Sequence, residues 1–335
     1  MIFIKVVGLI FWLEKIEYEV VILKIDFWLF FKGVLMGAAD IVPGVSGGTI
    51  AFITGIYERL LLSLQSILPA LFELIKNRSF SAFWKKINGT FLMTLFSGIL
   101  LSVLMLAKLI IYLLINHPIP LWSFFFGLIV ASVSIVGKQI SEWNVRLFVS
   151  VAAGALIAFF FTQLAPASVE HNYLNAFLSG LIAICAMILP GISGSFILVM
   201  LGTYSFILGA IKEFDIIVLA IFASGCLIGL LSIANVLVWA FSHFRNITLA
   251  LLTGFMIGAL TKVWPWKEIL TYREDRHGRL LPLLEQNVLP NTYELITGAS
   301  AQVGMAFVCF VVAIVGVLLL ESFASRSKSP VPDEV

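Results

Sequence analysis

The sequence predicts an all-α polytopic membrane protein built as an inverted repeat, in which each half is a broken, re-entrant helical hairpin plus three transmembrane helices. Three observations lead to this fold. Hydrophobic residues make up 61% of the 335 residues and charged residues only 12%, which is about half the charged share of a soluble protein. Six segments are long and apolar enough to cross a bilayer, and one short phrase with a helix-breaking Pro-Gly pair occurs twice.

The chain begins with an apolar stretch that is too short to span a membrane. Residues 1–13 are followed by three glutamates, lysines lie among the apolar residues, and no small-residue cleavage site follows. A removed signal peptide is therefore not expected. We predict an interfacial helix over residues 1–26.

Six predicted spans follow from the requirement for about 20 mostly apolar residues per crossing. They are residues 90–115, 119–137, 145–164, 215–242, 247–264 and 298–321. Two further apolar stretches, around 27–68 and 173–211, contain the Pro-Gly pairs. Ten residues separate Gly33 from Pro43, or about 15 Å of helix and half a bilayer. Each stretch can thus enter to mid-depth and return, although full crossing by its two halves stays open.

The repeated phrase reads DIVPGVSGGT at 40–49 and MILPGISGSF at 187–196. At this offset of 147, ten of the twenty-five positions 33–57 are identical, glycines and prolines among them. Downstream, an offset of 127 pairs Ser97-Gly98 and Gly127 with Ser224-Gly225 and Gly254. The offset falls by 20 because the first half contains an insertion, which lies in the polar, basic loop 73–89. Chance similarity between apolar stretches does not explain these matches.

An odd number of crossings in each unit starts the second unit from the opposite side of the membrane. We therefore predict two inverted repeats, residues 27–164 and 173–322, related by a two-fold axis in the membrane plane. With the N-terminus inside, thirteen lysines and arginines fall in cytoplasmic segments and six in outer ones. The positive-inside rule then predicts a cytoplasmic (inner) membrane protein with both termini inside, ending in a cytoplasmic tail, residues 323–335.

The two Pro-Gly breaks carry the chemistry. Proline and glycine end one half-helix, and Ser46 is placed to cap the next. A helix start carries about half a positive charge and free N–H donors, which suit phosphate or another anion. We predict an anion site between two half-helix N-termini, formed by Ser46, Gly47, Gly48, Thr49, Ser193, Gly194 and Ser195. Close packing by small residues and cation coordination by carbonyls of the broken ends remain alternatives.

Three charged residues belong to the first copy alone: Asp40, Glu58 and Arg59 stand where the second copy has Met187, Ser205 and Phe206. Asp40 and Glu58 are candidates for ion coupling, with protons or sodium as the ion. For Asp40 a structural role, hydrogen bonding to the turn at 44–48, is equally open. Arg59 either extends to the interface or serves as the first docking point for an anionic headgroup.

Several functions are not expected from this sequence. Three scattered cysteines without CxxC spacing and four scattered histidines predict no metal site, and we expect no cofactor. HExxH and Walker A motifs are absent, so the chain is not expected to be an enzyme. The sequence has no basic stripe, so we expect no nucleic acid partner. Two other function classes are compatible with an anion site in the membrane: an anion channel or ion-coupled small-anion transporter, and a membrane-embedded lipid phosphatase. The oligomeric state is not predicted.

The first break and its flanks resemble the undecaprenyl-phosphate (polyprenyl-phosphate) translocases. The residues that carry this resemblance are KGVLMGAADIVPGVSGGTI at 32–50 and GIYERL at 55–60. LPGISGS at 189–195 and GALTKVWPWK at 258–267 also resemble that family. The resemblance covers about residues 30 to 322 and leaves the first 26 outside. It implies transport of a polyprenyl-phosphate lipid from the outer to the cytoplasmic leaflet, which recycles the lipid carrier of cell-wall synthesis.

Overall fold

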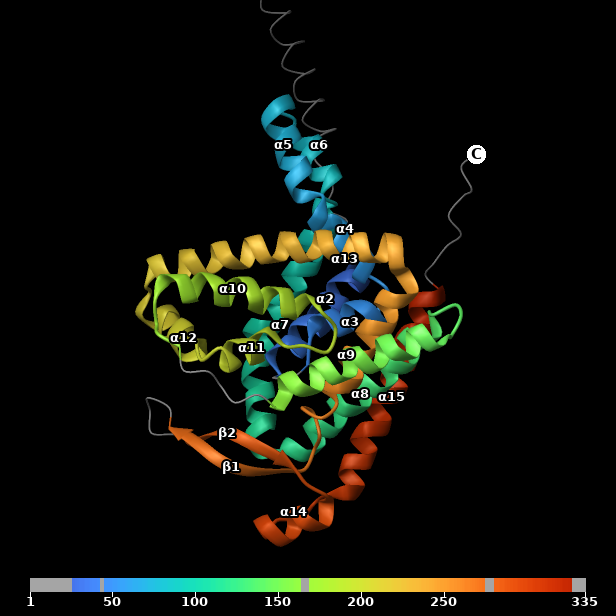
Figure 1. Cartoon of the computed structure of the whole chain (residues 1–335), viewed down its shortest axis with the longest axis vertical. Coiled ribbons are helices and arrows are strands. Elements are labelled where there is room, and N and C mark those ends of the chain that lie inside the picture. Colours follow the sequence, from blue (N-terminus) through green and yellow to red (C-terminus); the bar gives the residue numbers. More distant parts are fainter. Residues whose placement is uncertain (1–25, 43–44, 164–168, 275–279, 327–335) are drawn as a thin grey trace, which may run out of the picture.

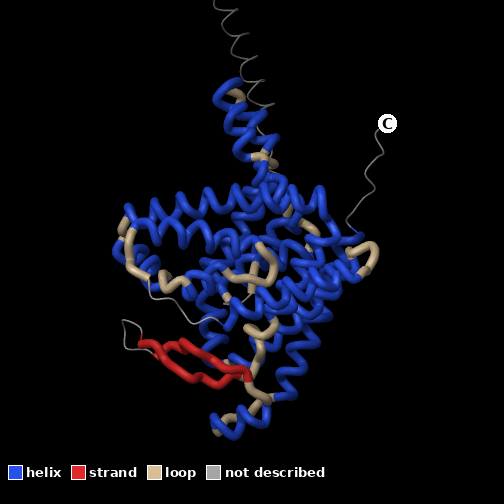
Figure 2. Tube along the Cα trace, in the orientation of Figure 1, coloured by secondary structure: helices blue, strands red, loops and turns tan. Residues whose placement is uncertain are grey.

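The computed structural model describes residues 26–42, 45–163, 169–274 and 280–326. The predicted interfacial helix at 1–26 therefore lies almost wholly outside the described residues, as do Pro43, Gly44 and most of the tail. Helices form most of the molecule, and a single antiparallel hairpin lies at one edge (Figure 2).

The first half of the described chain contains α2 (Phe27–Ile41), α3 (Gly47–Ile53), α4 (Tyr57–Gln65), α5 (Ile67–Asn77), α6 (Phe80–Lys86), α7 (Gly89–Asn116), α8 (Pro118–Lys138) and α9 (Val145–Gln163). The second half contains α10 (Tyr173–Ile188), α11 (Gly194–Met200), α12 (Tyr204–Glu213), α13 (Ile216–Ala259), β1 (Lys267–Glu274), β2 (Leu280–Asn287), α14 (Pro290–Thr297) and α15 (Val303–Arg326). Figure 1 shows their arrangement.

Polar residues at the ends of the apolar segments start several of these helices. Asp26 accepts hydrogen bonds from two backbone N–H groups of α2, and Asp215 does the same for α13. Asn172 caps α10 through the N–H of Asn175. Each cap satisfies donors that the first turn of a helix leaves free. The starts of α2, α10 and α13 are thus encoded locally.

Six helical segments of the described chain are long and apolar enough to cross a membrane: residues 57–77, α7, α8, α9, α13 and α15. The 44 residues of α13 would reach about 66 Å if straight, more than twice the hydrocarbon thickness. Phe244 interrupts α13 with non-helical φ −138° and ψ 46°, close to the boundary expected between spans 215–242 and 247–264. The chain is a multi-pass, mostly helical membrane protein.

The long helices pack in pairs. α2 lies along α7, α10 lies along α13, α9 also lies along α13, and α15 lies along α8. Glycines let these backbones approach closely, because a Cβ would collide with a carbonyl oxygen of the facing helix. These glycine–carbonyl contacts are Gly33–Leu95 and Gly98–Phe30 for α2 and α7, Gly180–Phe222 and Gly225–Phe177 for α10 and α13, Gly127–Phe310 for α8 and α15, and Gly254–Val151 for α13 and α9.

The two predicted hairpins end up in different surroundings. All seven residues of α3 are buried, and its neighbours include α2, α4, α8 and α10. In α11, only Phe196 and Ile197 are buried. The helix pair α11–α12 is bent by 108° at the break between its two helices. The first hairpin therefore lies inside the protein and the second nearer its surface.

Two segments expected as loops have structure of their own. The polar loop 73–89 is largely helical, and α5 and α6 project together from the body (Figure 1), joined by an ion pair between Glu73 and Lys86. The outer segment 265–297 contains the two paired strands and α14. The all-α expectation was incomplete here, because β-branched and aromatic residues in 267–274 favour a strand and its charged residues concealed that pattern.

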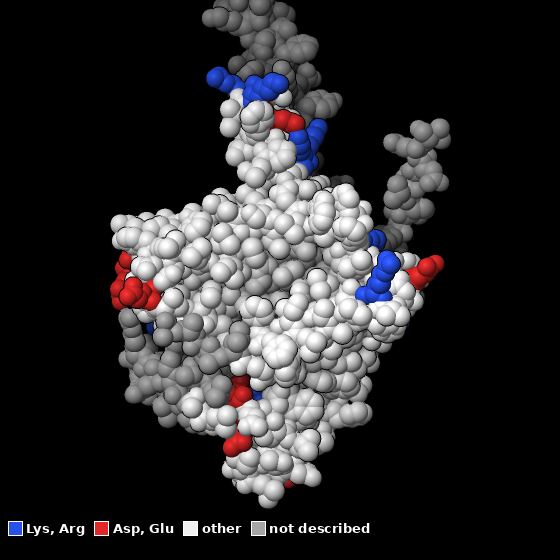
Figure 3. Space-filling view, in the orientation of Figure 1, with Lys and Arg blue, Asp and Glu red and all other residues white. Residues whose placement is uncertain are grey.

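On the face shown in Figure 3, charged side chains lie at the margins of the molecule. In Figure 3 they gather on the α5–α6 projection and at the edges, while a broad uncharged surface lies between them. Water-facing ends and a lipid-facing middle account for this distribution.

Candidate functional site

The two breaks meet inside the protein. The Ser46 hydroxyl donates to the Met187 carbonyl at 2.8 Å, with the Leu189 carbonyl at 3.3 Å, and the Tyr57 hydroxyl donates to the Ile188 carbonyl at 3.1 Å. These carbonyls lie at the C-terminal end of α10, where a helix leaves its last carbonyls without intrahelical partners. Side chains of the first hairpin therefore complete the backbone hydrogen bonding of the second.

A hydrogen bond also runs the other way. The backbone N–H of Gly191 donates to the Thr49 hydroxyl at 3.0 Å. Gly191 has a left-handed φ of +87°, and a Cβ there would lie 2.9 Å from the Met256 Cα of α13. Only glycine fits this turn without strain. The geometry at the second break thus depends on α3 and α13 together.

The start of α3 is closed by groups of the protein itself. Ser46 is the N-cap and accepts from the Gly48 N–H at 3.1 Å. The Gly47 N–H donates to the Asp40 carboxylate at 2.7 Å, and a Cβ on Gly47 would lie 2.5 Å from that carboxylate. The Asp40 carboxyl group therefore occupies the position that the sequence predicted for a bound anion. The hydrogen bond to the turn, one of two roles expected for Asp40, is present.

The start of α11 is finished differently. Ser193 makes no capping hydrogen bond to α11, and its hydroxyl instead lies 3.0 Å from the Ser195 hydroxyl. Met187 stands in the place of Asp40 and has no carboxylate to accept from the Gly194 N–H. The predicted residues of the two breaks are brought close, and of these only Gly194 and Ser195 are partly exposed, while Ser193 is buried.

A narrow pocket adjoins this second break. It is lined by Gly191, Ile192 and Phe196 from the break and α11, by residues at the end of α9, and by Lys262, which follows α13. The Lys262 ammonium lies 5.0 Å from the centre of the Phe196 ring and 3.6 Å from the Glu285 carboxylate. Sequence reasoning placed Lys262 among the charges of an outer loop and missed it as a site residue. Its position near the end of the predicted span 247–264 was the available signal.

Lys262 shares Glu285 with a second lysine. The Lys267 ammonium donates to the Glu285 carboxylate at 3.2 Å and to the Lys262 carbonyl at 2.9 Å, and it lies 4.0 Å from the centre of the Trp122 ring. Burial lowers the pKa of Lys267 from its ordinary 10.5 to about 8, and Glu285 offsets only part of this change. Burial would raise the pKa of Glu285, but Lys267 and Lys262 hold it below its ordinary value.

Glu58 and Arg59 lie apart from the breaks, beyond the C-terminal end of α3. Glu58 forms a two-point ion pair with Arg245, with N–O distances of 2.7 and 3.0 Å. Arg245 follows Phe244 directly, so the pair joins α4 to the bend in α13. The exposed Arg59 guanidinium lies 4.3 Å from the centre of the Phe91 ring. Neither residue contributes to the junction between the breaks.

The chain is similar to known proteins over most of its length. The family described as undecaprenyl phosphate translocase-like matches residues 36–281. A polyprenyl-phosphate transporter of Vibrio cholerae is 49% identical over 297 residues, covering 89% of this chain and 96% of the relative. A polyprenyl-phosphate transporter of Staphylococcus aureus is 32% identical over 252 residues, covering 70% of this chain and 84% of the relative. No solved structure matches the chain. The chain belongs to the undecaprenyl phosphate translocase-like family of membrane proteins.

Proposed function

We propose that this chain is a polyprenyl-phosphate transporter that returns the lipid carrier from the outer to the cytoplasmic leaflet. The names of both relatives support the substrate class. The single observation that carries the proposal is the junction of the two breaks, because broken half-helices at membrane depth persist only where protein or a wet cavity satisfies their backbone groups. Such transport requires no nucleophile, so the proposal does not make the chain an enzyme.

The proposal includes two inverted repeats, residues 27–164 and 173–322. Matching glycine–carbonyl contacts support it: Gly33–Leu95 and Gly98–Phe30 become Gly180–Phe222 and Gly225–Phe177 on adding 147 to residues of α2 and 127 to residues of α7. The pairing of α8 with α15 likewise corresponds to that of α13 with α9. In Figure 1, α10 and α11 approach α2 and α3 from one side. A two-fold rotation that exchanges the two halves would produce each of these helix pairs from its counterpart.

The phosphate is held, in this proposal, between the starts of α11 and α3. Of the two breaks it meets the second one first, through Gly194 and Ser195, because these two residues are partly exposed and no carboxylate accepts from their N–H groups. Ser46, Gly47, Gly48 and Thr49 are buried and engaged in this conformation. The phosphate therefore reaches them only when the junction opens and Asp40 releases Gly47. Protonation of Asp40 would favour that release, which makes protons the simplest coupling ion, with sodium as the alternative.

The orientation belongs to the same proposal. Both termini are placed in the cytoplasm and the hairpin β1–β2 outside the cytoplasmic membrane. The α8–α9 turn, the bend at Phe244 and the end of α15 lie at one end of the molecule in Figure 1, opposite α12. Arg59 and the Glu58–Arg245 pair then lie on the cytoplasmic side, where Arg59 is exposed and able to receive the departing phosphate.

The test is leaflet exchange of a labelled polyprenyl phosphate in liposomes that contain the purified protein. We expect exchange with wild type and a strong loss in Ser193→Ala/Ser195→Ala, with Ser205→Ala as a control outside the junction. Absence of exchange by wild type, together with rapid flux of a small anion, would replace the transporter with a channel. Exchange unchanged in the double variant would remove the second break from the site.

A further inference from the structure

Lys262 is the accessible cation of a three-residue charge cluster. Lys262 and Lys267 share the single carboxylate of Glu285, so the cluster carries one excess positive charge when both lysines are protonated. Lys267 is committed to that carboxylate, a carbonyl and an aromatic face, and its side chain is only 8% exposed. The Lys262 side chain is 24% exposed and lies farther from Glu285. An incoming anion would therefore meet Lys262.

The pocket beneath Lys262 is too narrow for a phosphate in this conformation. Its cavity volume is about 20 Å³, roughly the space of one water molecule. Thr162 also lines the pocket, where its hydroxyl donates to the Phe159 carbonyl at 2.7 Å and lies 3.3 Å from the Thr261 hydroxyl. Lys262 thus offers a cation at the mouth, beside the Thr162 side chain and next to Gly191 of the second break.

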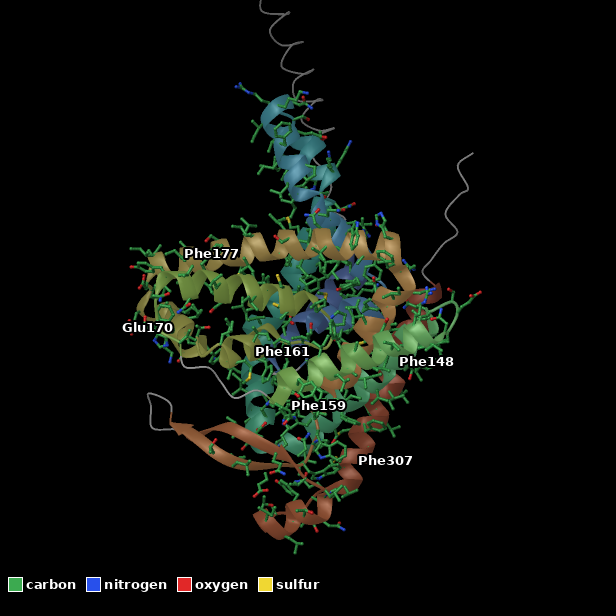
Figure 4. The ribbon with its side chains drawn as sticks, in the orientation of Figure 1. Phe148, Phe159, Phe161, Glu170, Phe177 and Phe307 are labelled. Carbon is green, nitrogen blue, oxygen red and sulfur yellow. The ribbon has the colours of Figure 1, made fainter. Side chains whose placement is uncertain are left out.

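An apolar groove continues from this mouth along α9. It has a volume of about 480 Å³ and is lined by Ala153, Leu156, Ile157, Phe160 and Phe161. These positions form one stripe of a helix, about 12 Å long at 1.5 Å per residue. Phe161 lines both the groove and the Lys262 pocket. Figure 4 shows Phe161 at the end of α9 beside α11, with Phe148 at the opposite end of the same helix.

A cation at one end of an apolar groove matches an amphiphile with one anionic head. We infer that Lys262 and the α9 groove form the docking site at which a prenyl lipid monophosphate binds before it reaches the junction of the breaks. The headgroup contacts Lys262 and Thr162, and the first prenyl units lie along the stripe from Phe161 to Ala153. This inference rests on the proposed function and names where its substrate first binds.

The charge difference between lipids gives the site its selectivity. A monophosphate brings a net negative charge to a cluster with one excess positive charge, whereas a zwitterionic phospholipid brings none. Lys262 therefore favours the monophosphate over the zwitterionic phospholipids that would otherwise occupy the groove. A soluble phosphate would use Lys262 without the groove, so dependence on both parts distinguishes a lipid from a free ion.

The first test measures the initial rate of leaflet exchange against the amount of long-chain polyprenyl phosphate in liposomes. Lys262→Gln removes the charge and keeps most of the side chain, and we expect its half-saturating lipid concentration to rise about tenfold with little change in maximal rate. Lys262→Arg keeps the charge, and we expect its half-saturating lipid concentration to stay close to that of wild type. Lys212→Gln, at the exposed end of α12, is the matched control with no expected change.

The second test addresses the groove. Ala153→Phe adds bulk at the far end of the stripe, away from the Lys262 cluster. We expect it to raise the half-saturating concentration for a long-chain polyprenyl phosphate and leave inhibition by a short, water-soluble prenyl phosphate unchanged. An equal effect on both compounds, or none on either, would remove the groove from the site.

The two proposals fail in different ways. If wild type exchanges no polyprenyl phosphate, the proposed function itself is wrong. If wild type exchanges it and Lys262→Gln matches Lys212→Gln at every lipid concentration, the docking site is wrong while the transporter stands. Thermal unfolding of Lys262→Gln in detergent checks that the β1–β2 hairpin and its Glu285 contact do not account for the change. A fall in thermal stability with an unaltered half-saturating concentration would also count against docking at Lys262.

Discussion

The two breaks share Pro-Gly-x-Ser-Gly, yet one is closed by the protein and the other is open. At the first, Asp40 accepts from Gly47, Ser46 accepts from Gly48, and α3 is buried throughout. At the second, Met187 replaces Asp40, the serines bond each other, and most of α11 is not buried. The same backbone motif is therefore capped by the carboxyl group of Asp40 at the first break and by no charged group at the second. A single carboxylate decides which half-helix start retains donors for an external anion.

This asymmetry also gives the repeats separate roles. The first hairpin supplies Ser46, Tyr57 and Thr49 as hydrogen-bonding partners for the second, so it acts as a framework. The second hairpin lies beside Lys262 and the groove on α9. In the proposed transport, two equivalent sites on a two-fold axis would bind the substrate equally from both leaflets. Different capping of the two breaks would instead allow capture on one side and release on the other.

The largest expected effect comes from the turn of the second break. Gly191→Ala combines a left-handed φ with a contact to the Met256 backbone, and we expect a loss of about 3 kcal/mol in stability. Gly55→Ala is the matched control, since Gly55 has φ +71° with nothing within 4 Å of an added Cβ, and about 1 kcal/mol is expected. Thermal or denaturant unfolding in detergent measures both. Equal losses would mean that the contact with α13 is unimportant.

The next effect tests the closure of the first break. Asp40→Ala leaves the Gly47 N–H without its acceptor, and we expect a loss of about 2 kcal/mol. Asp40→Asn keeps an acceptor oxygen and should lose less. Met187→Ala is the corresponding change at the second break, where no such hydrogen bond exists to lose. Comparable unfolding temperatures for Asp40→Ala and Asp40→Asn would contradict a capping role for the carboxylate.

A third change makes the second break resemble the first. In Met187→Asp the new carboxylate lies next to Gly194, because the Met187 Cβ is 3.2 Å from the position of a Gly194 Cβ. It should accept from α11 and repel phosphate, and we expect about a tenfold rise in the half-saturating concentration of polyprenyl phosphate. The leaflet-exchange assay measures this, with Met187→Leu as control. An unaffected Met187→Asp variant would place the phosphate elsewhere.

The smallest effect concerns pH at the charge cluster beside the second break. Because the pKa of Lys267 is about 8 in the folded protein and ordinarily 10.5, the unfolded chain binds more protons between these values. Stability should therefore rise as pH increases from about 8 to 10.5. Glu285 is ionised throughout this range and adds no slope. Thermal unfolding of wild type and Lys267→Met across the range should differ in slope, and parallel curves would contradict the burial of a charged Lys267.

Much of the fold was predictable because its signals are local. Apolar segments marked the long helices, and the boundary expected between residues 242 and 247 lies at the bend of Phe244. Ser46 was predicted as an N-cap and is one. The strands β1 and β2 were not predicted, since pairing of residues 267 with 287 and 274 with 280 depends on contacts across a charged loop. The predicted phosphate contacts and coupling role of Asp40 stay predictions.

Hydropathy, proline and glycine act within a few residues, so the sequence alone predicts a multi-pass helical membrane protein with two Pro-Gly breaks. The contacts that each break makes are visible only in the folded protein. Ser46 finds its acceptor 141 residues away at Met187, and Thr49 receives the N–H of Gly191. Lys262 meets Phe196 and Glu285 only after α13 and the hairpin are in place. Hydrogen bonds and charges depend on distances in space, so the difference between an occupied and an open half-helix start emerged only from the fold.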